Sequence, residues 1–359
     1  MSESQMDKGE SPDAAASTLR GRARLVDVAE RSGVTKSIVS RIMNDDRSLR
    51  IRPETRERVK AVAEELGYRP HAGARALSVS RTGAFALLIP DLTNTVYAAI
   101  MRGAFRRAKE HGYVLLIAED TPDAPAGPDD YAELVVSGRV DGLLVASARP
   151  GNPLVDRLMQ DPTSVAHVFV NREVEGSGRN IGLDMHGASA LAVNYLHSHG
   201  HREIGLTAGP PDLHPARSRR EGFVDRMTSL GLDPARIAHG EFSERGGFEA
   251  AGELLAAYPN LTALYASTFG QAVGALKAAR ERGLRVPEDL SVIAYDDLSV
   301  AEYLDPPLTT VAMPLDALGV AAVDALVEQL TTQKPAEYRL PDGYRVVERK
   351  SVATRRIAN

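Results

Sequence analysis

The sequence contains no cysteine and no tryptophan among its 359 residues, and aromatic residues make up only 5% of it. The lack of cysteine excludes a disulfide scaffold, a zinc–thiolate site, an iron–sulfur cluster and a thiol nucleophile. The chain also lacks an apolar run of roughly 18 residues, the length that a membrane-spanning helix needs. Its first 20 residues have no apolar core of a signal peptide, so we expect a cytoplasmic protein without membrane contact.

The short motifs of common enzymes are absent too. The sequence has no G-x-S-x-G, no H-E-x-x-H, no Walker loop and no strand-linked G-x-G-x-x-G. His197, His199 and His201 have a metal-like spacing by count, but residues two apart do not share a helix face. We therefore predict a protein that is not an enzyme and that uses no metal and no cofactor.

The net charge of −5 conceals an uneven distribution. Residues 1–19 carry a net charge of −3, residues 20–82 carry +7, and residues 83–359 carry −9. A short basic segment ahead of a long acidic one suggests a separate domain that binds a polyanion. The alternative is that its arginines form solvated helix faces with carboxylates four residues away.

Residues 25–70 have the apolar spacing of three short helices, and the first two form a helix-turn-helix pattern. Gly33 suits the turn because a positive φ costs glycine little, and Thr35 is a good N-cap for the second helix. Val39 and Ile42 are expected to bury that helix. Polar and basic side chains remain on its outer face, as in a helix that enters a DNA major groove: Lys36, Ser37, Ser40 and Arg41. A helical hairpin without function is the alternative.

From residue 84 onward, short apolar strands alternate with helices of 10–15 residues. The predicted strands cover 84–89, 113–118, 142–146, 166–170, 203–208, 263–267 and 291–295. This alternation predicts parallel sheets with helices on both faces. The strands and helices fall into two successive series of similar length, and this favours two α/β lobes over one sheet.

Several motifs occur in the order found in one family. They include Val26-Asp-Val-Ala-Glu30, Val39-Ser-Arg-Ile-Met-Asn44, Leu66-Gly-Tyr-Arg-Pro70, Arg139-Val-Asp-Gly142 and Tyr295-Asp-Asp297. From Leu25 to about Arg356 the chain resembles the lactose-repressor/galactose-repressor (LacI/GalR) family of transcription regulators. The resemblance implies a small all-α helix-turn-helix head and an α/β two-lobed body like periplasmic binding proteins.

The resemblance also divides the chain. We expect a disordered tail over 1–22, a helix-turn-helix domain over 23–70, a hinge over 71–82, and an effector-binding and dimerisation domain over 83–359. Lobe 1 would span about 83–183 and 312–340, and lobe 2 about 184–311 and 341–356. The chain would cross between the lobes near Leu183, Val311 and Leu340.

By the same resemblance, the DNA contacts lie in the head and the hinge. Lys36, Ser37 and Arg41 occupy the base-reading positions, next to Thr35 and Ser40. The loop after Asn44 is about two residues longer than usual, and its Arg47 and Arg50 would reach phosphates or remain solvated. In the hinge, Arg75 and Leu77 would contact DNA, with Leu77 wedged into the minor groove. About eight residues cannot hold a helix alone, so hinge folding would be coupled to DNA binding; a plain linker is the alternative.

Ligand contacts in the body are also implied by the resemblance, each with plain structural use as its alternative. Arg219 would grip the effector, and Tyr97 and Phe242 would sandwich a ring. One departure matters: Thr268 and Phe269 replace the Asn-Asp pair of sugar-binding members, and a phenyl ring accepts no hydroxyl hydrogen bond. The remaining candidates are Asn171, Arg172, Asp184 and Gln271, while Asp296 would serve a structural role.

The sequence therefore predicts a homodimeric, ligand-responsive transcription regulator, most often a repressor. Its partners would be a pseudo-palindromic double-stranded DNA operator and a small effector, such as a sugar or related metabolite, and lobe 1 would form most of the dimer. One alternative is an orphan regulator with a non-sugar effector or none. Another is a soluble binding protein or enzyme with an incidental head.

Overall fold

The computed structural model describes residues 23–44, 46, 48–68, 81–120, 131, 133–135, 137–341 and 343–355. The chain divides between Thr82 and Gly83 into two compact units, here called the head and the body. The expected tail over 1–22 and hinge residues 71–80 lie outside the described residues. Among the described helices, none is long and apolar enough to cross a membrane.

The head consists of three helices: α1 (Leu25–Ser32), α2 (Lys36–Met43) and α3 (Pro53–Glu65). Proline at the first position of α3 has a fixed φ that suits a helix start. The three helices meet in a small core of buried side chains: Val28, Ala29, Val39, Ile42, Val59 and Ala63. The all-α head predicted from apolar spacing is confirmed, with each helix supplying two of these side chains.

The first lobe of the body is built on a parallel sheet of six strands in the order β11-β5-β4-β3-β1-β2. Its strands are β1 (Ala84–Ile89), β2 (Val114–Glu119), β3 (Gly142–Val145), β4 (His167–Val170), β5 (Asn180–Gly182) and β11 (Tyr338–Arg339). Side chains alternate along β1, so Phe85 and Leu87 join one core while Ala86 and Leu88 join another. The first core contains residues of α5 (Val96–Glu110) and α12 (Leu315–Thr332), and the second contains residues of α7 (Pro153–Gln160).

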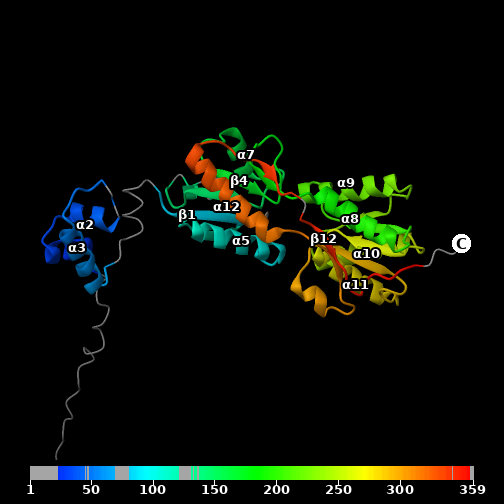
Figure 1. Cartoon of the computed structure of the whole chain (residues 1–359). Coiled ribbons are helices and arrows are strands. Elements are labelled where there is room, and N and C mark those ends of the chain that lie inside the picture. The colour runs from blue at the N-terminus through cyan, green and yellow to red at the C-terminus, as the bar shows by residue number, and fades with distance from the viewer. Residues whose placement is uncertain are drawn as a thin grey trace, which may run out of the picture. The chain divides into compact units, whose positions relative to one another are not determined.

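The second lobe repeats this arrangement with the strand order β12-β10-β9-β8-β6-β7, in which only β12 is antiparallel to its neighbour. Its strands are β6 (Ile204–Ala208), β7 (Ile237–His239), β8 (Ala263–Ala266), β9 (Ser291–Tyr295), β10 (Thr309–Ala312) and β12 (Arg345–Val347). Its helices are α8 (Met185–Ser198), α9 (His214–Ser229), α10 (Glu244–Ala257) and α11 (Phe269–Glu281), with a 3-10 helix over Ser299–Tyr303. Figure 1 shows α8 and α9 close together, and α10 beside α11. The parallel α/β body with two lobes is therefore confirmed.

The chain passes between the lobes three times. The connections join β5 to α8, β10 to α12, and β11 to β12. The expected crossing positions Leu183, Val311 and Leu340 lie within or beside these connections. Because parallel strands of both sheets end toward these connections, the loops after the strands face a shared cleft.

Candidate nucleic-acid interface and ligand cleft

The turn between α1 and α2 has the geometry that its residues predict. Gly33 has φ 66°, in the left-handed region that glycine adopts without strain. Thr35 is in extended conformation, and its hydroxyl oxygen accepts a hydrogen bond from the backbone N–H of Ile38 at 3.4 Å. These two local features fix where α2 begins and which way it points from α1.

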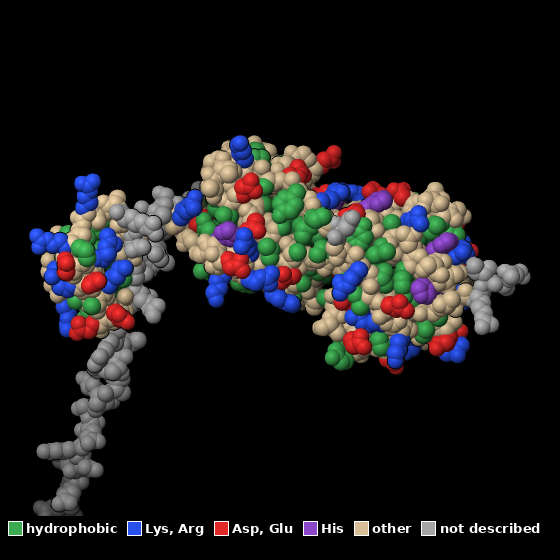
Figure 2. Space-filling model, in the orientation of Figure 1, with side chains coloured by type: hydrophobic (Ala, Val, Ile, Leu, Met, Phe, Trp, Pro, Cys, Tyr) green, Lys and Arg blue, Asp and Glu red, His purple; other side chains and the backbone are tan. Residues whose placement is uncertain are grey.

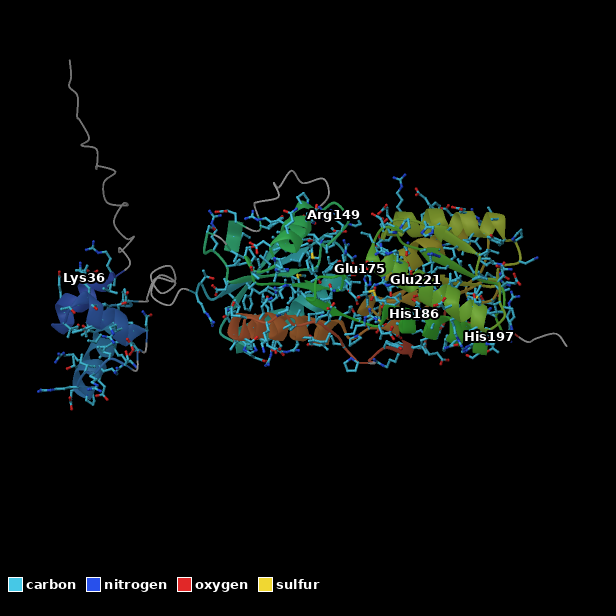
Figure 3. The ribbon with its side chains drawn as sticks, turned by 90° about the horizontal axis from the view of Figure 1, so that it is seen from above. Lys36, Arg149, Glu175, His186, His197 and Glu221 are labelled. Carbon is cyan, nitrogen blue, oxygen red and sulfur yellow. The ribbon has the colours of Figure 1, made fainter. Side chains whose placement is uncertain are left out.

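One side of α2 is buried and the other is free for contact. Val39 and Ile42 point into the head core, whereas Lys36, Ser37 and Arg41 are exposed. Figure 3 labels Lys36 on the surface of the head, and Figure 2 shows other lysine and arginine side chains spread over the visible face of the head. A short helix with an exposed polar and basic face has the shape and chemistry to enter a major groove.

The long loop after α2 holds Arg41 in place. The Arg41 Nε donates to an Asp46 carboxylate oxygen at 2.7 Å, and another guanidinium nitrogen donates to the Ser48 hydroxyl at 3.0 Å. Hydrogen bonds from Ser48 and Arg41 lower the pKa of Asp46 to about 2, so its carboxylate remains charged. The loop thus orients a predicted base-reading residue, and Arg50 beyond it is exposed.

Three of the predicted DNA contacts have no described position. Arg47, Arg75 and Leu77 lie outside the described residues, and their roles stay predictions. Ser40 lies on α2 and is half-buried, so its hydroxyl is at the edge of the exposed face.

The cleft of the body runs between the loops that follow the strands of both lobes. Two adjoining hollows share the residues Asp91, Asn94, Phe242 and Ser243, so they form one continuous cleft. Three predicted ligand contacts line it: Arg172, Phe242 and Phe269. The five others do not line either hollow: Tyr97, Asn171, Asp184, Arg219 and Gln271.

Arg219 lies behind Phe242 in a buried polar cluster. Its guanidinium carbon is 3.8 Å from the ring centre of Tyr295 and 5.7 Å from that of Phe242, and one nitrogen donates to the Ser267 carbonyl at 2.7 Å. Beside it, neither carboxylate oxygen of Asp296 has a hydrogen-bond partner among the described residues, although the side chain is buried. Burial raises the pKa of Asp296 to about 6, against the opposing attraction of Arg219.

Sequence reasoning assigned Asp296 a structural role. Asp296 lines neither hollow, but its buried carboxylate, without a partner among the described residues, makes it a candidate functional residue behind the cleft wall. A buried polar group without a partner is costly, and functional sites are where such groups persist. The available signal was its position directly after β9, at the strand end where ligands bind in this architecture.

Gln271, by contrast, has its hydrogen bonds filled by the protein. Its amide nitrogen lies within hydrogen-bonding distance of the carbonyls of Ala208, Gly240 and Glu241, and its oxygen accepts from the Ser267 hydroxyl at 2.8 Å. The side chain is fully buried. In this arrangement Gln271 connects the ends of neighbouring strands through its side-chain amide, and its ligand role stays a prediction.

Two of the other predicted ligand contacts that do not line the cleft also have structural partners, Asp184 and Tyr97. The Asp184 carboxylate caps α8 by accepting from the Gly187 N–H at 2.8 Å, and its other oxygen accepts from the Tyr344 hydroxyl at 3.2 Å. The Tyr97 hydroxyl donates to the Ala146 carbonyl at 3.5 Å. Asn171 is buried with φ 63° at the end of β4. Their ligand roles stay predictions.

Two of the three histidines of the 197–201 segment have contacts within the fold, His199 and His201. His201 is buried, with one ring nitrogen 2.9 Å from the Thr262 hydroxyl and the other 3.0 Å from the Ala353 carbonyl. His199 contacts the Tyr195 carbonyl. Within the described ranges, no group of three or more histidine, aspartate or glutamate side chains is placed to hold a metal ion.

Comparisons with known proteins match both units. Residues 24–71 match the model of "Bacterial regulatory proteins, lacI family", and residues 193–352 match that of a periplasmic binding protein-like domain. The HTH-type transcriptional repressor CytR of Escherichia coli K12 is 32% identical over 87% of this chain and 91% of its own length. The ribose operon repressor of the same strain is 33% identical over 89% of this chain and 96% of its own length. A solved structure of the Lac repressor dimer bound to operator and the anti-inducer ONPF is similar to this chain with a TM-score of 0.82 and 27% sequence identity. The match covers 92% of this chain and 99% of the repressor chain.

Proposed function

The chain belongs to the lacI family of bacterial regulatory proteins, and on that premise we propose that it is a transcriptional repressor. It binds operator DNA through α2, and a small ligand in the body cleft controls that binding. The observation that carries the proposal is the exposed polar and basic face of α2, turned outward by Gly33 and Thr35. We place the protein in the cytoplasm, where its operator is, and assign it no enzymatic activity.

The DNA-reading role is tested on a duplex selected by the protein itself from random DNA. Arg41→Ala should weaken binding in fluorescence anisotropy about fivefold or more, since a good base contact contributes about 1–3 kcal/mol. Leu77→Ala should also weaken it, because it removes the apolar wedge from the minor groove. Arg245→Ala, which removes an exposed body arginine paired with Glu249, is the charge-matched control. Affinity that is unchanged in both head and hinge variants would refute the assignment.

A homodimer explains the apolar side chains that the body leaves exposed. Phe105 on α5 and Val114 and Leu116 on the edge strand β2 are 46–62% exposed, and Tyr303 in lobe 2 is 84% exposed. Exposed apolar residues on an edge strand mark an interaction surface, and a Lac repressor dimer is among the similar structures. Val114→Asp should yield monomers in sedimentation velocity and weaken operator binding, whereas a variant that stays dimeric would contradict this surface.

A second candidate is an orphan regulator that answers to no sugar. Phe269 favours it, because its ring lines the cleft where a hydroxyl acceptor would hold a sugar. Thr268, its neighbour, caps α11 by accepting from the Gln271 N–H at 3.2 Å. A thermal-shift screen of sugars, nucleosides and sugar acids separates the candidates. If no compound stabilises a dimer that binds DNA, the orphan regulator replaces the ligand-controlled one.

A further inference from the structure

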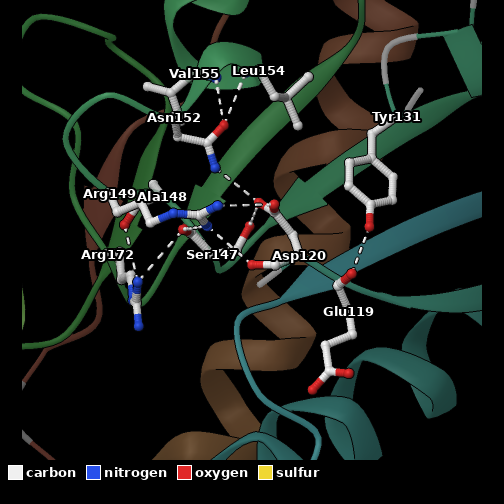
Figure 4. Close-up of polar contacts among 10 residues, drawn as sticks. All are labelled: Glu119, Asp120, Tyr131, Ser147, Ala148, Arg149, Asn152, Leu154, Val155 and Arg172. Carbon is white, nitrogen blue, oxygen red and sulfur yellow. Dashed lines mark hydrogen bonds and ion pairs between the residues drawn. The ribbon is translucent and has the colours of Figure 1, made fainter. Parts of the chain in front are cut away.

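Two arginines of lobe 1 line the cleft, Arg149 and Arg172, and they differ in whether a carboxylate of the described residues lies at ion-pair distance. Arg149 lies near the buried carboxylate of Asp120, 3.3 Å from one of its oxygens, and Ser147 and Asn152 donate to the other oxygen at 2.6 and 2.8 Å (Figure 4). The charge of Arg149 is thereby neutralised within the protein.

Arg172 has no such partner. One of its terminal nitrogens donates to the carbonyls of Ala148 at 3.2 Å and Ser147 at 3.5 Å, and Figure 4 shows the rest of the guanidinium directed away from them. Within the described ranges no carboxylate lies at ion-pair distance from it, yet its exposed fraction is only 8%. Burying a charge without a counter-charge is costly, so a lone guanidinium in a cleft wall is a ready partner for an anion.

The carbonyl contacts fix the orientation of Arg172. Ser147 and Ala148 follow β3, and Arg172 follows β4, which is the neighbouring strand. A guanidinium held along one edge keeps its other N–H groups in a fixed fork, the geometry that binds two oxygens of a carboxylate or phosphate together.

Charges elsewhere in the cleft are arranged around this group. The acidic side chains that line the same hollow are Asp91, whose carboxylate accepts from Thr93 at 2.7 Å, and the exposed Asp212 and Glu241. The amino-terminal end of α10 also opens onto the cleft through Ser243, and helix amino termini favour anions, although the exposed carboxylate of Glu244 lines the adjoining hollow. The cleft is thus cationic at its buried wall and acidic at its exposed rim.

We propose that the ligand of this cleft carries an oxyanion, a phosphate ester or a carboxylate, that binds the free edge of Arg172. The proposal rests on the ligand-controlled function above and names the class of its ligand. Phe242 and Pro210 supply the apolar surface against which the uncharged part of the ligand packs. Arg149, already neutralised, frames the site without competing for the anion.

The test measures the melting temperature of the full-length protein with matched pairs of probes at about 10 mM, a concentration that fills even millimolar sites. The pairs are ribose with ribose 5-phosphate and glucose with glucuronate, and inorganic phosphate is added alone. We expect an anionic member to raise the melting temperature more than its neutral partner. The phosphate and carboxylate arms show which oxyanion the site prefers.

Variants assign the effect to Arg172. Arg172→Gln should weaken binding of the anionic probe by at least about tenfold in titration calorimetry, and Arg172→Lys should restore part of it by returning charge without the fork. Arg285→Gln, which removes an arginine paired with Asp289 before β9, is the charge-matched control and should bind as the wild type does.

Two results overturn the proposal. One is that no anionic probe stabilises the wild type, or that each neutral partner stabilises it equally. The other is that Arg172→Gln keeps the full preference for the anion. Operator binding, measured in parallel, separates this failure from failure of the proposed function: a wild type that binds DNA but prefers neutral probes remains a ligand-controlled repressor with a different ligand.

Discussion

Asp296→Asn should make the protein without ligand more stable at neutral pH. The carboxylate of Asp296 is buried beside Arg219 and has no hydrogen-bond partner among the described residues. Its pKa is raised from 3.8 to about 6, so the ionised side chain costs about 3 kcal/mol in the fold relative to the unfolded chain. This figure already includes the attraction of Arg219. Asparagine keeps the shape and tolerates the φ of 72° at this position.

The stability gained by Asp296→Asn should depend on pH, because the charge of Asp296 does. Between pH 4 and 6 the folded protein binds more protons at Asp296 than the unfolded chain does, so this group lowers stability as the pH rises. The cost is absent below pH 4 and complete above pH 6. The gain from Asp296→Asn should therefore be near zero at pH 4 and about 3 kcal/mol at pH 7.5, or roughly 6 °C for a unit of this size.

The assay is thermal unfolding followed by circular dichroism, because the chain has no tryptophan to report by fluorescence. Asp297→Asn is the matched control, since Asp297 pairs with Arg349 at 2.8 Å and accepts from the Thr310 hydroxyl. That variant should lose stability at pH 7.5. The reasoning is refuted if Asp296→Asn is destabilised like its neighbour, or if its gain is the same at both pH values.

Three further outcomes are expected. Burial lowers the pKa of His167 and of His201 to about 4, so the unfolded chain binds more protons at these two groups below pH 6.5. The melting temperature should fall from pH 6.5 toward pH 4, because the two histidines together outweigh the opposing change at Asp296, and a flat profile would contradict this. Gly103→Ala would place its Cβ 1.9 Å from a backbone oxygen of α12 and should cost about 1–3 kcal/mol in unfolding experiments. Asp46→Asn should free Arg41, raise affinity for unrelated DNA and lower the ratio of operator to unrelated binding in anisotropy; an unchanged ratio would show that the loop does not orient Arg41.

Local features of the sequence predicted local structure well. Gly33 and Thr35 act on the two or three residues around them, so their types alone indicate the turn and the cap. Seven of the strands could be predicted for a similar reason, because an apolar run bounded by polar residues needs no distant partner to be recognised; these are β1, β2, β3, β4, β6, β8 and β9. The predicted strands do not include β5, β7, β10, β11 and β12, which have two to four residues each. The helix α12 was not identified, because the chain returns from β10 in lobe 2 to α12 in lobe 1 before β12 joins the sheet of lobe 2, and this interrupts the alternation.

Roles in the cleft were harder to predict because they depend on which partners are already satisfied. Asp184 and Gln271 have the right chemistry for a ligand, but the fold uses one as a helix cap and the other to connect strand ends. Asp296 has the same chemistry as Asp184 and is left without a partner among the described residues. The residue type shows that a side chain can bind a ligand, and only the packed structure shows whether its polar atoms already have partners in the protein.

The wall that holds Arg172 is connected to the other lobe through the next residue. The Glu173 carboxylate accepts from Arg339 on β11 at 2.9 Å and lies 3.5 Å from a ring nitrogen of His214 at the start of α9. An anion bound to Arg172 therefore lies beside Glu173, which connects lobe 1 to Arg339 on β11 and to His214 in lobe 2. A ligand that changes this contact changes the free energy of one lobe arrangement relative to another. If operator DNA favours one of these arrangements, the ligand changes the affinity for DNA, and DNA changes the affinity for the ligand by the same factor.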